Sequence, residues 1–134
     1  VDGHHSVEDI GIALGQAIAK AIGSKKGIRR YGSFYLPMDE ALAFVSLDIS
    51  GRPFLVYDGG EMAPMIGGYD TELTEEFLRA FAVHAGITLH VKILYGKNSH
   101  HKVEAIFKAL GHALRIAAER DPRVEGIPST KGSL

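Results

Sequence analysis

The stretch HHSVEDIGIALGQAIAKA at residues 4–21 recurs as HHKVEAIFKALGHALRIA at residues 100–117, and this repeat decides the fold. Both copies begin with two adjacent histidines, and a glutamate follows at the same position in each. The apolar and small residues behind the glutamate keep the same register to the end of each copy. Chance rarely preserves so many identities over so short a stretch, so we interpret the two copies as a duplicated supersecondary unit.

Helices and strands alternate between and around the two copies. Apolar residues at helical spacing predict a first helix that ends at Gly23, and Thr71 is a suitable N-cap for a second one. We therefore expect an α+β fold, a duplicated half-domain with sheets packed on helices, and an irregular tail from residue 121. The predicted helices cover residues 7–22, 72–85 and 100–120, and the predicted strands cover residues 41–49, 53–57 and 87–95.

Composition argues against several classes of function. Fifteen Lys and Arg face sixteen Asp and Glu, so a formal net charge of -1 gives no support to nucleic-acid binding or to a membrane surface. Because the sequence has no cysteine, disulfide scaffolds, thiolate metal sites and cysteine nucleophiles are excluded. No apolar run is long enough to span a bilayer, and no charged-then-apolar leader precedes the first motif. We expect a soluble, cytoplasmic protein that binds neither nucleic acid nor membranes.

The two histidine pairs are candidate metal ligands. In each copy the first histidine and the glutamate are spaced i,i+4 and the second histidine and the glutamate i,i+3, so a helix brings the side chains together. Adjacent histidines point roughly 100° apart on a helix, so they serve two ions better than one. Imidazole and carboxylate without thiolate suit Mn, Fe or Zn, and a higher-coordinate N/O site favours Mn²⁺. Histidines that only cap a helix would explain one pair more readily than two pairs in register.

A second group of candidates is basic. Arg30, Arg52 and residues 129–131 are cations and hydroxyls close to turn glycines. The planar fork of arginine matches phosphate oxygens, and Lys, Ser and Thr add further donors. Solvated loop charge would explain these residues equally well, so the residues alone do not decide between the two interpretations.

A resemblance to a known family emerges when the motifs are read together. In order along the chain they are HHSVEDIGIALG (4–15), RYG (30–32), PMDEA (37–41), DISGRP (48–53), NSHHKVE (98–104) and PSTKG (128–132). They resemble imidazoleglycerol-phosphate dehydratase from end to end. This resemblance implies a manganese-dependent lyase of L-histidine biosynthesis that dehydrates imidazole glycerol phosphate to imidazole acetol phosphate, with two Mn²⁺ per active site. It also implies a half-domain resembling the second domain of ribosomal protein S5, trimers that assemble into a 24-subunit shell, and active sites between subunits.

The resemblance also implies roles for individual residues. Glu8 and Glu104 would be catalytic as well as metal-binding, and Glu76 stands where family members carry His or Glu. The implied metal ligands are His4, His5, Glu8, Glu76, His100, His101 and Glu104. The implied substrate-binding residues, mainly for the phosphate, are Arg30, Arg52, His100, Ser129, Thr130 and Lys131.

The resemblance also predicts how the chain is divided. We expect residues 1–134 to form a single dehydratase domain, with residues 1–38 as the remainder of a first half-repeat, 39–120 as the second half-repeat and 121–134 as a substrate-binding tail. Family chains carry a segment before the first histidine pair that supplies a further metal ligand. We expect this sequence to lack that segment.

The chemistry of this reaction explains the need for two ions. The departing hydroxyl and the abstracted proton lie on carbons with no adjacent carbonyl, so we predict that the substrate's imidazole serves as the electron sink, as a metal-stabilised imidazolate. A metal-stapled structural oligomer without turnover remains an alternative, although it has no use for phosphate-binding residues. A binuclear hydrolase would need a water-activating carboxylate outside the ligand set, and the sequence offers no strong candidate.

Overall fold

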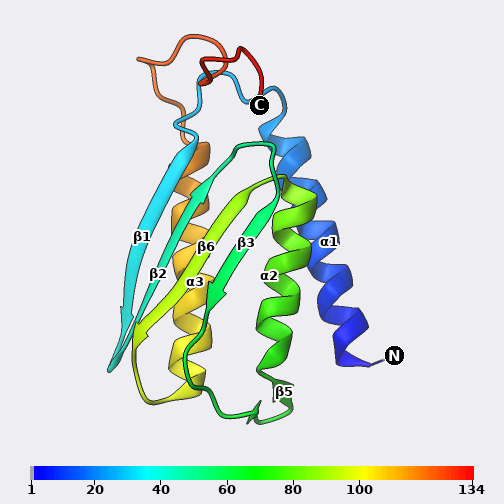
Figure 1. Cartoon of the computed structure of the whole chain (residues 1–134), viewed down its shortest axis with the longest axis vertical. Coiled ribbons are helices and arrows are strands. Elements are labelled where there is room, and N and C mark those ends of the chain that lie inside the picture. Colours follow the sequence, from blue (N-terminus) through cyan, green and yellow to red (C-terminus); the bar gives the residue numbers. More distant parts are fainter. Residues whose placement is uncertain (1) are drawn as a thin grey trace.

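The computed structural model describes residues 2–134, which form a four-stranded sheet with helices on one side (Figure 1). The sheet has the order β1-β2-β6-β3, in which β2 pairs antiparallel with β1 and β6, and β3 pairs parallel with β6. Helices α2 and α3 pack on the sheet, and α1 packs along α2. The elements are α1 Gly3–Ile22, β1 Tyr31–Met38, β2 Ala41–Asp48, β3 Phe54–Asp58, β4 Met65–Ile66, β5 Tyr69–Asp70, α2 Glu72–Ala85, β6 Thr88–Tyr95 and α3 Ser99–Ala118.

The duplicated sequence forms duplicated helices. α1 and α3 each have 20 residues, and each carries its histidine pair in the first turn. Their caps also correspond, because the side chain of Asp2 accepts from the backbone of His5 and that of Asn98 accepts from the backbone of His101. The first helix therefore begins four residues earlier than apolar spacing predicted, since its first turn is polar and is ordered by the cap.

The sequence pattern did not predict β1 or the two-residue strands β4 and β5. Gly32 and Pro37 both disfavour strands, yet each has a local reason to be there. A Cβ at Gly32 would collide with the carbonyl of Ala113, so glycine lets β1 approach α3 closely. Pro37 is tolerated because β1 lies at the edge of the sheet. The expected boundary between half-repeats at residue 39 falls in the turn of the β1–β2 hairpin, and it stays a prediction.

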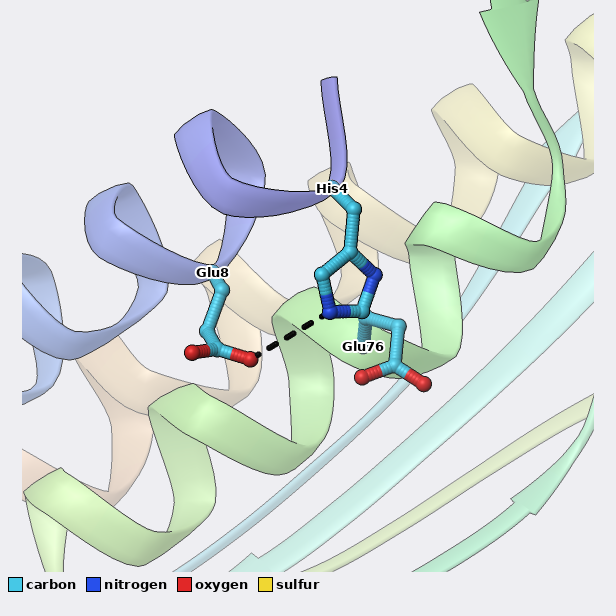
Figure 2. A group of neighbouring side chains, drawn as sticks. All are labelled: His4, Glu8 and Glu76. Carbon is cyan, nitrogen blue, oxygen red and sulfur yellow. Dashed lines mark ion pairs between the residues drawn. The ribbon is translucent and has the colours of Figure 1, made fainter. Parts of the chain in front are cut away.

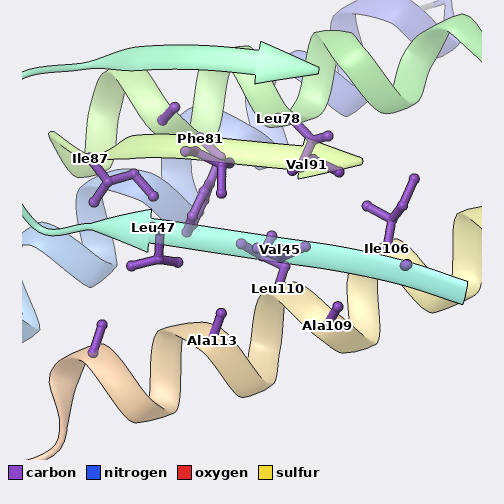
Figure 3. Packing of buried hydrophobic residues seen from close by; sticks show 14 of the residues in the cluster. Val45, Leu47, Leu78, Phe81, Ile87, Val91, Ile106, Ala109, Leu110 and Ala113 are labelled. Atoms are coloured by element: carbon purple, nitrogen blue, oxygen red, sulfur yellow. The ribbon is translucent and has the colours of Figure 1, made fainter. Parts of the chain in front are cut away.

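The core lies between the inner face of the sheet and helices α2 and α3 (Figure 3). Val45 and Leu47 of β2 point inward, because alternate residues of a strand share a face. Phe81 of α2 and Ile106 of α3 meet them and are fully buried. Transfer from water contributes about 1.5–3 kcal/mol for each large apolar side chain of this kind.

Helix α1 approaches α2 most closely at two glycines, and of its apolar residues Val7, Ile18 and Ile22 are half-buried against the core. Gly11 and Gly15 are its buried residues, and a Cβ added at Gly11 would lie 3.0 Å from the carbonyl oxygen of Phe77. Ile10 and Leu14 remain 58% and 44% exposed. The absence of side chains at the two glycines therefore sets the distance between α1 and α2.

Candidate metal centre and phosphate-binding end

Three of the predicted metal ligands converge at the start of α1. His4, Glu8 and Glu76 each offer a ligand atom, and these atoms all lie within 4.8 Å of one another (Figure 2). The Nε2 atom of His4 is 3.5 Å from the Glu8 carboxylate, because residues i and i+4 are neighbours on a helix. Glu76 reaches them from α2, which lies against α1. One imidazole and two carboxylates form an N/O donor set that suits Mn²⁺.

The second motif repeats this geometry on α3. The Nε2 atom of His100 is 2.9 Å from the Glu104 carboxylate, which also pairs with Lys108 at 3.1 Å. The hydrogen bond from Lys108 is the main reason why the pKa of Glu104 is lowered. Among residues 2–134, His100 and Glu104 are joined by no third side chain within ligand distance, so the structure assembles one three-ligand cluster in the single chain.

The second histidine of each pair is held by a carboxylate at its Nδ1 atom. This atom of His5 lies 3.1 Å from Asp2, and that of His101 lies 2.6 Å from Glu40. Backbone N–H groups of Asn98 and Lys97 also donate to Glu40, and these hydrogen bonds lower its pKa to about 2.

The pKa of His101 shifts in the opposite direction from that of Glu40. Its pKa is raised, chiefly by the hydrogen bond to Glu40. Glu40 was not among the predicted site residues. The PMDEA motif that contains Glu40 was the available signal, but the sequence does not reveal that this turn meets the start of α3.

The basic candidates lie at the end of the folded molecule opposite the histidine pairs. The backbone N–H of Arg30 donates to Ala117 near the end of α3 at 2.9 Å, and its guanidinium donates to Asp48 and to the carbonyl of Pro128. Asp48 raises the pKa of Arg30. The C-terminal residue Leu134 lies against Gly51, beside Arg52. Arg30 thus connects the sheet to the tail that carries Ser129, Thr130 and Lys131, of which the latter two are exposed.

The two ends are far apart within one chain. A helix rises 1.5 Å per residue, so Ala117 lies about 25 Å along α3 from His100. The tail and the start of α1 accordingly lie at opposite ends of the molecule (Figure 1). The metal cluster and the basic residues of a single chain therefore cannot contact one small molecule together.

The helices of the described residues are α1, α2 and α3, which have 20, 14 and 20 residues. Within residues 2–134, none combines the length and the apolar character that crossing a bilayer requires.

Comparison with known proteins identifies the family. The imidazoleglycerol-phosphate dehydratase family pattern matches residues 1–114, so the match ends before the tail. Imidazoleglycerol-phosphate dehydratases of Clostridium botulinum (strain Kyoto / Type A2) and Symbiobacterium thermophilum are 61% and 58% identical to this chain over all of its 134 residues. The matched region spans 68% and 64% of those two proteins.

Solved structures agree. Imidazoleglycerol-phosphate dehydratase from Staphylococcus aureus subsp. aureus N315 matches with a TM-score of 0.86 and 48% identity over 90% of this chain and 70% of its own. The Pyrococcus furiosus structure in complex with (S)-C348 matches with a TM-score of 0.86 and 43% identity over 98% of this chain and 71% of its own. The predicted resemblance and the α+β fold with a sheet packed on helices are confirmed. The chain belongs to the imidazoleglycerol-phosphate dehydratase family.

Proposed function

We propose that this chain is a manganese-dependent hydro-lyase that removes water from imidazole glycerol phosphate to give imidazole acetol phosphate, in the cytoplasmic biosynthesis of L-histidine. Membership of the family supports the reaction and the pathway. The single observation that carries the metal-dependent part is the convergence of His4, Glu8 and Glu76 from two helices.

The donor atoms present fit manganese. All seven proposed ligands offer imidazole nitrogen or carboxylate oxygen, and the sequence contains no thiolate that would favour a softer metal. When bound, Mn²⁺ would act as a Lewis acid on the imidazole of the substrate. One site would use the cluster on α1 and α2, and the other would be built around the corresponding pair on α3. The proposed ligands are His4, His5, Glu8, Glu76, His100, His101 and Glu104.

Glu8 and Glu104 are the proposed proton carriers. Loss of the hydroxyl requires a proton donor, and loss of the carbon-bound hydrogen requires an acceptor. The two glutamates hold equivalent positions on α1 and α3, each within 4 Å of a histidine Nε2 atom. In the proposed reaction one carboxylate would donate the proton to the departing hydroxyl, and the other would accept the carbon-bound proton.

The basic end would hold the phosphate. Arg52 and Lys131 are exposed and make no ion pair among the described residues, so both are available to an anion. A guanidinium has five N–H donors, and Arg30 uses three of them on Asp48 and Pro128. In the proposed site the remaining two N–H groups would donate to a phosphate oxygen. Ser129, Thr130 and Lys131 would add donors from the tail that Arg30 secures.

The separation of about 25 Å between these ends requires a shared active site. The phosphate-binding end of one chain must meet the metal-binding end of another, so self-association is part of the proposal. The trimer and the 24-subunit shell implied by the family are arrangements that could provide such a meeting.

Subunit complementation tests the proposal. His100→Ala removes a metal ligand, and Arg52→Ala removes a phosphate contact at the opposite end of the chain. Each variant alone should lose turnover of imidazole glycerol phosphate in the presence of Mn²⁺. A mixture of the two, unfolded and reassembled together, should regain part of the activity, because some sites then combine two intact ends.

Two results would contradict the proposal. Retained turnover after exhaustive chelation would exclude the metal role. Stoichiometric Mn²⁺ binding by an assembled protein that never turns over the substrate would instead favour the metal-stapled structural oligomer.

A further inference from the structure

The contacts of His101 differ from those of the other histidines in the two pairs. Its side chain is 27% exposed, whereas that of His100 is 63% exposed. The difference arises because Glu40, in the turn of the β1–β2 hairpin, reaches across to the first turn of α3. No metal ligand is implied at this hairpin, so its contact with the site needs a separate explanation.

Both oxygens of Glu40 are engaged, and in different directions. Oε1 lies 2.6 Å from Nδ1 of His101. Oε2 accepts hydrogen bonds from the backbone N–H groups of Lys97 and Asn98, each at 2.9 Å. The backbone hydrogen bonds hold the carboxylate in place, and the carboxylate in turn holds the imidazole ring.

The chemistry of this contact determines which ring nitrogen faces away from Glu40. A carboxylate only accepts, so Nδ1 of His101 donates to Glu40, and Nε2 on the opposite side of the ring lies 3.6 Å from Oδ2 of the exposed Asp39. Metal-binding histidines commonly donate their other ring N–H to a carboxylate, and this fixes both the tautomer and the ring orientation. We propose, on the basis of the metal-dependent function above, that Glu40 is a positioning residue that presents Nε2 of His101 to the metal.

The first histidine pair supplies an independent argument. There Asp2 performs two tasks, because it caps α1 through the backbone of His5 at 2.8 Å and lies 3.1 Å from the ring Nδ1 of the same residue. At the second pair the cap is Asn98, and Glu40 from another element contacts the ring. The duplicated halves therefore reach the same ring contact with residues that do not correspond. Helix capping alone would require no such contact.

The experiment compares Mn²⁺ affinity with stability in the full chain. The Mn²⁺ dissociation constant is measured from the electron paramagnetic resonance of free Mn²⁺, and the melting temperature is measured separately in chelator. Glu40→Gln should weaken Mn²⁺ binding roughly 10- to 100-fold. In a His101→Ala background the same substitution should change the affinity by less than about twofold, because Glu40 acts through His101.

A rescue variant follows from the duplication. Asn98→Asp places at the second pair the residue type that serves both tasks at the first pair. It should restore most of the Mn²⁺ affinity lost in Glu40→Gln. If Glu40 only linked the hairpin to α3, a carboxylate at residue 98 would not restore the affinity. If Glu40→Gln fails to fold, Asp2→Asn is the second variant. Residue 2 is exposed, and asparagine there keeps an acceptor for the helix cap but removes the carboxylate at the ring of His5.

The outcomes separate this inference from the proposed function. If Glu40→Gln lowers the melting temperature in chelator but leaves the Mn²⁺ affinity within twofold, and His101→Ala weakens it, Glu40 is only a structural link and the inference is overturned. If His101→Ala itself leaves Mn²⁺ binding unchanged, the metal role of His101 fails and the inference fails with it. If Asp2→Asn leaves the Mn²⁺ affinity unchanged, the carboxylate contact at the histidine ring does not support metal binding, and the inference is likewise overturned.

Discussion

Arg30 provides a quantitative test of how the phosphate-binding end is built. Its φ of +76° is in the left-handed region that favours glycine, although the residue is an arginine. The backbone is fixed there on both sides, since Arg30 donates to Ala117 at 2.9 Å and accepts from Ile49 at 3.0 Å. Arg30→Ala removes the side-chain contacts and keeps the strain, whereas Arg30→Gly removes both.

The magnitudes follow from these contacts. Charge-assisted hydrogen bonds are worth about 1.5–3 kcal/mol. The guanidinium and its partner Asp48 are 13% and 19% exposed, so solvent screens the pair only in part. Arg30→Ala should therefore lower the free energy of unfolding by about 2–3 kcal/mol. Arg30→Gly should lower it by about 1 kcal/mol less, because glycine relieves the left-handed strain.

Thermal unfolding of metal-free protein, followed by circular dichroism, measures the difference. For a chain of this length 1 kcal/mol corresponds to about 3–4 °C, so the melting temperature should fall by about 6–12 °C in Arg30→Ala and by about 3–4 °C less in Arg30→Gly. Arg52→Ala, at an exposed arginine, is the matched control and should change it by no more than about 2 °C. Equal losses in the alanine and glycine variants would refute the strain argument. An Arg30→Ala variant as stable as the control would refute the role of the side chain.

Three other predictions address the metal cluster, the fold and the tail. Glu76→Gln should weaken Mn²⁺ binding at least about tenfold in isothermal titration calorimetry while leaving the metal-free melting temperature nearly unchanged, and unaltered affinity would remove this residue from the ligand set. Gly32→Ala should lower the free energy of unfolding in urea by about 2–3 kcal/mol, because the new Cβ meets the backbone of α3. Its control Gly111→Ala, in open space on α3, should raise stability by about 0.5–1 kcal/mol, and similar effects of the two would contradict the steric argument. The pKa of Asp121 is lowered to about 2, mainly by the side chain of Arg123, from an ordinary value of 3.8. A carboxyl with a lowered pKa stabilises the fold above its unfolded pKa, so this contribution should be lost as the pH falls from about 4 to about 2. Asp121→Asn should reduce the dependence of the melting temperature on pH in that range. An equal pH dependence in the variant and the wild type would contradict the stabilising role of the Asp121 carboxylate.

The repeated helices and their histidine–glutamate contacts could be predicted because both depend on local spacing. Histidine and glutamate four residues apart meet on any helix, so the contacts of His4 with Glu8 and of His100 with Glu104 follow from the sequence. Glu76 could be added only through the family resemblance, since the spacing of residues does not reveal that α2 lies against α1.

The features that escaped prediction depend on long-range contacts. Strand β1 contains Gly32 because α3 passes close to it, and no local pattern contains that information. Glu40 resembled an ordinary solvated turn carboxylate until the hairpin met the start of α3. Arg30 was expected to bind substrate, and its engagement with Asp48 and Pro128 could not be inferred from isolated motifs.

The glycines of α1 have a consequence for the proposed metal site. Gly11 lies seven residues beyond His4, about 10 Å along the helix, and touches no ligand. It nevertheless limits how closely α1 approaches α2, because a methyl group there would lie 3.0 Å from the backbone oxygen of Phe77, and the two helices would have to separate by a few tenths of an ångström. His4 and Glu8 travel with α1 while Glu76 stays on α2, so the same displacement would widen the gap that an ion has to bridge. The spacing of the three proposed ligands is thus set two turns away from them, by how closely two helices approach rather than by any donor atom.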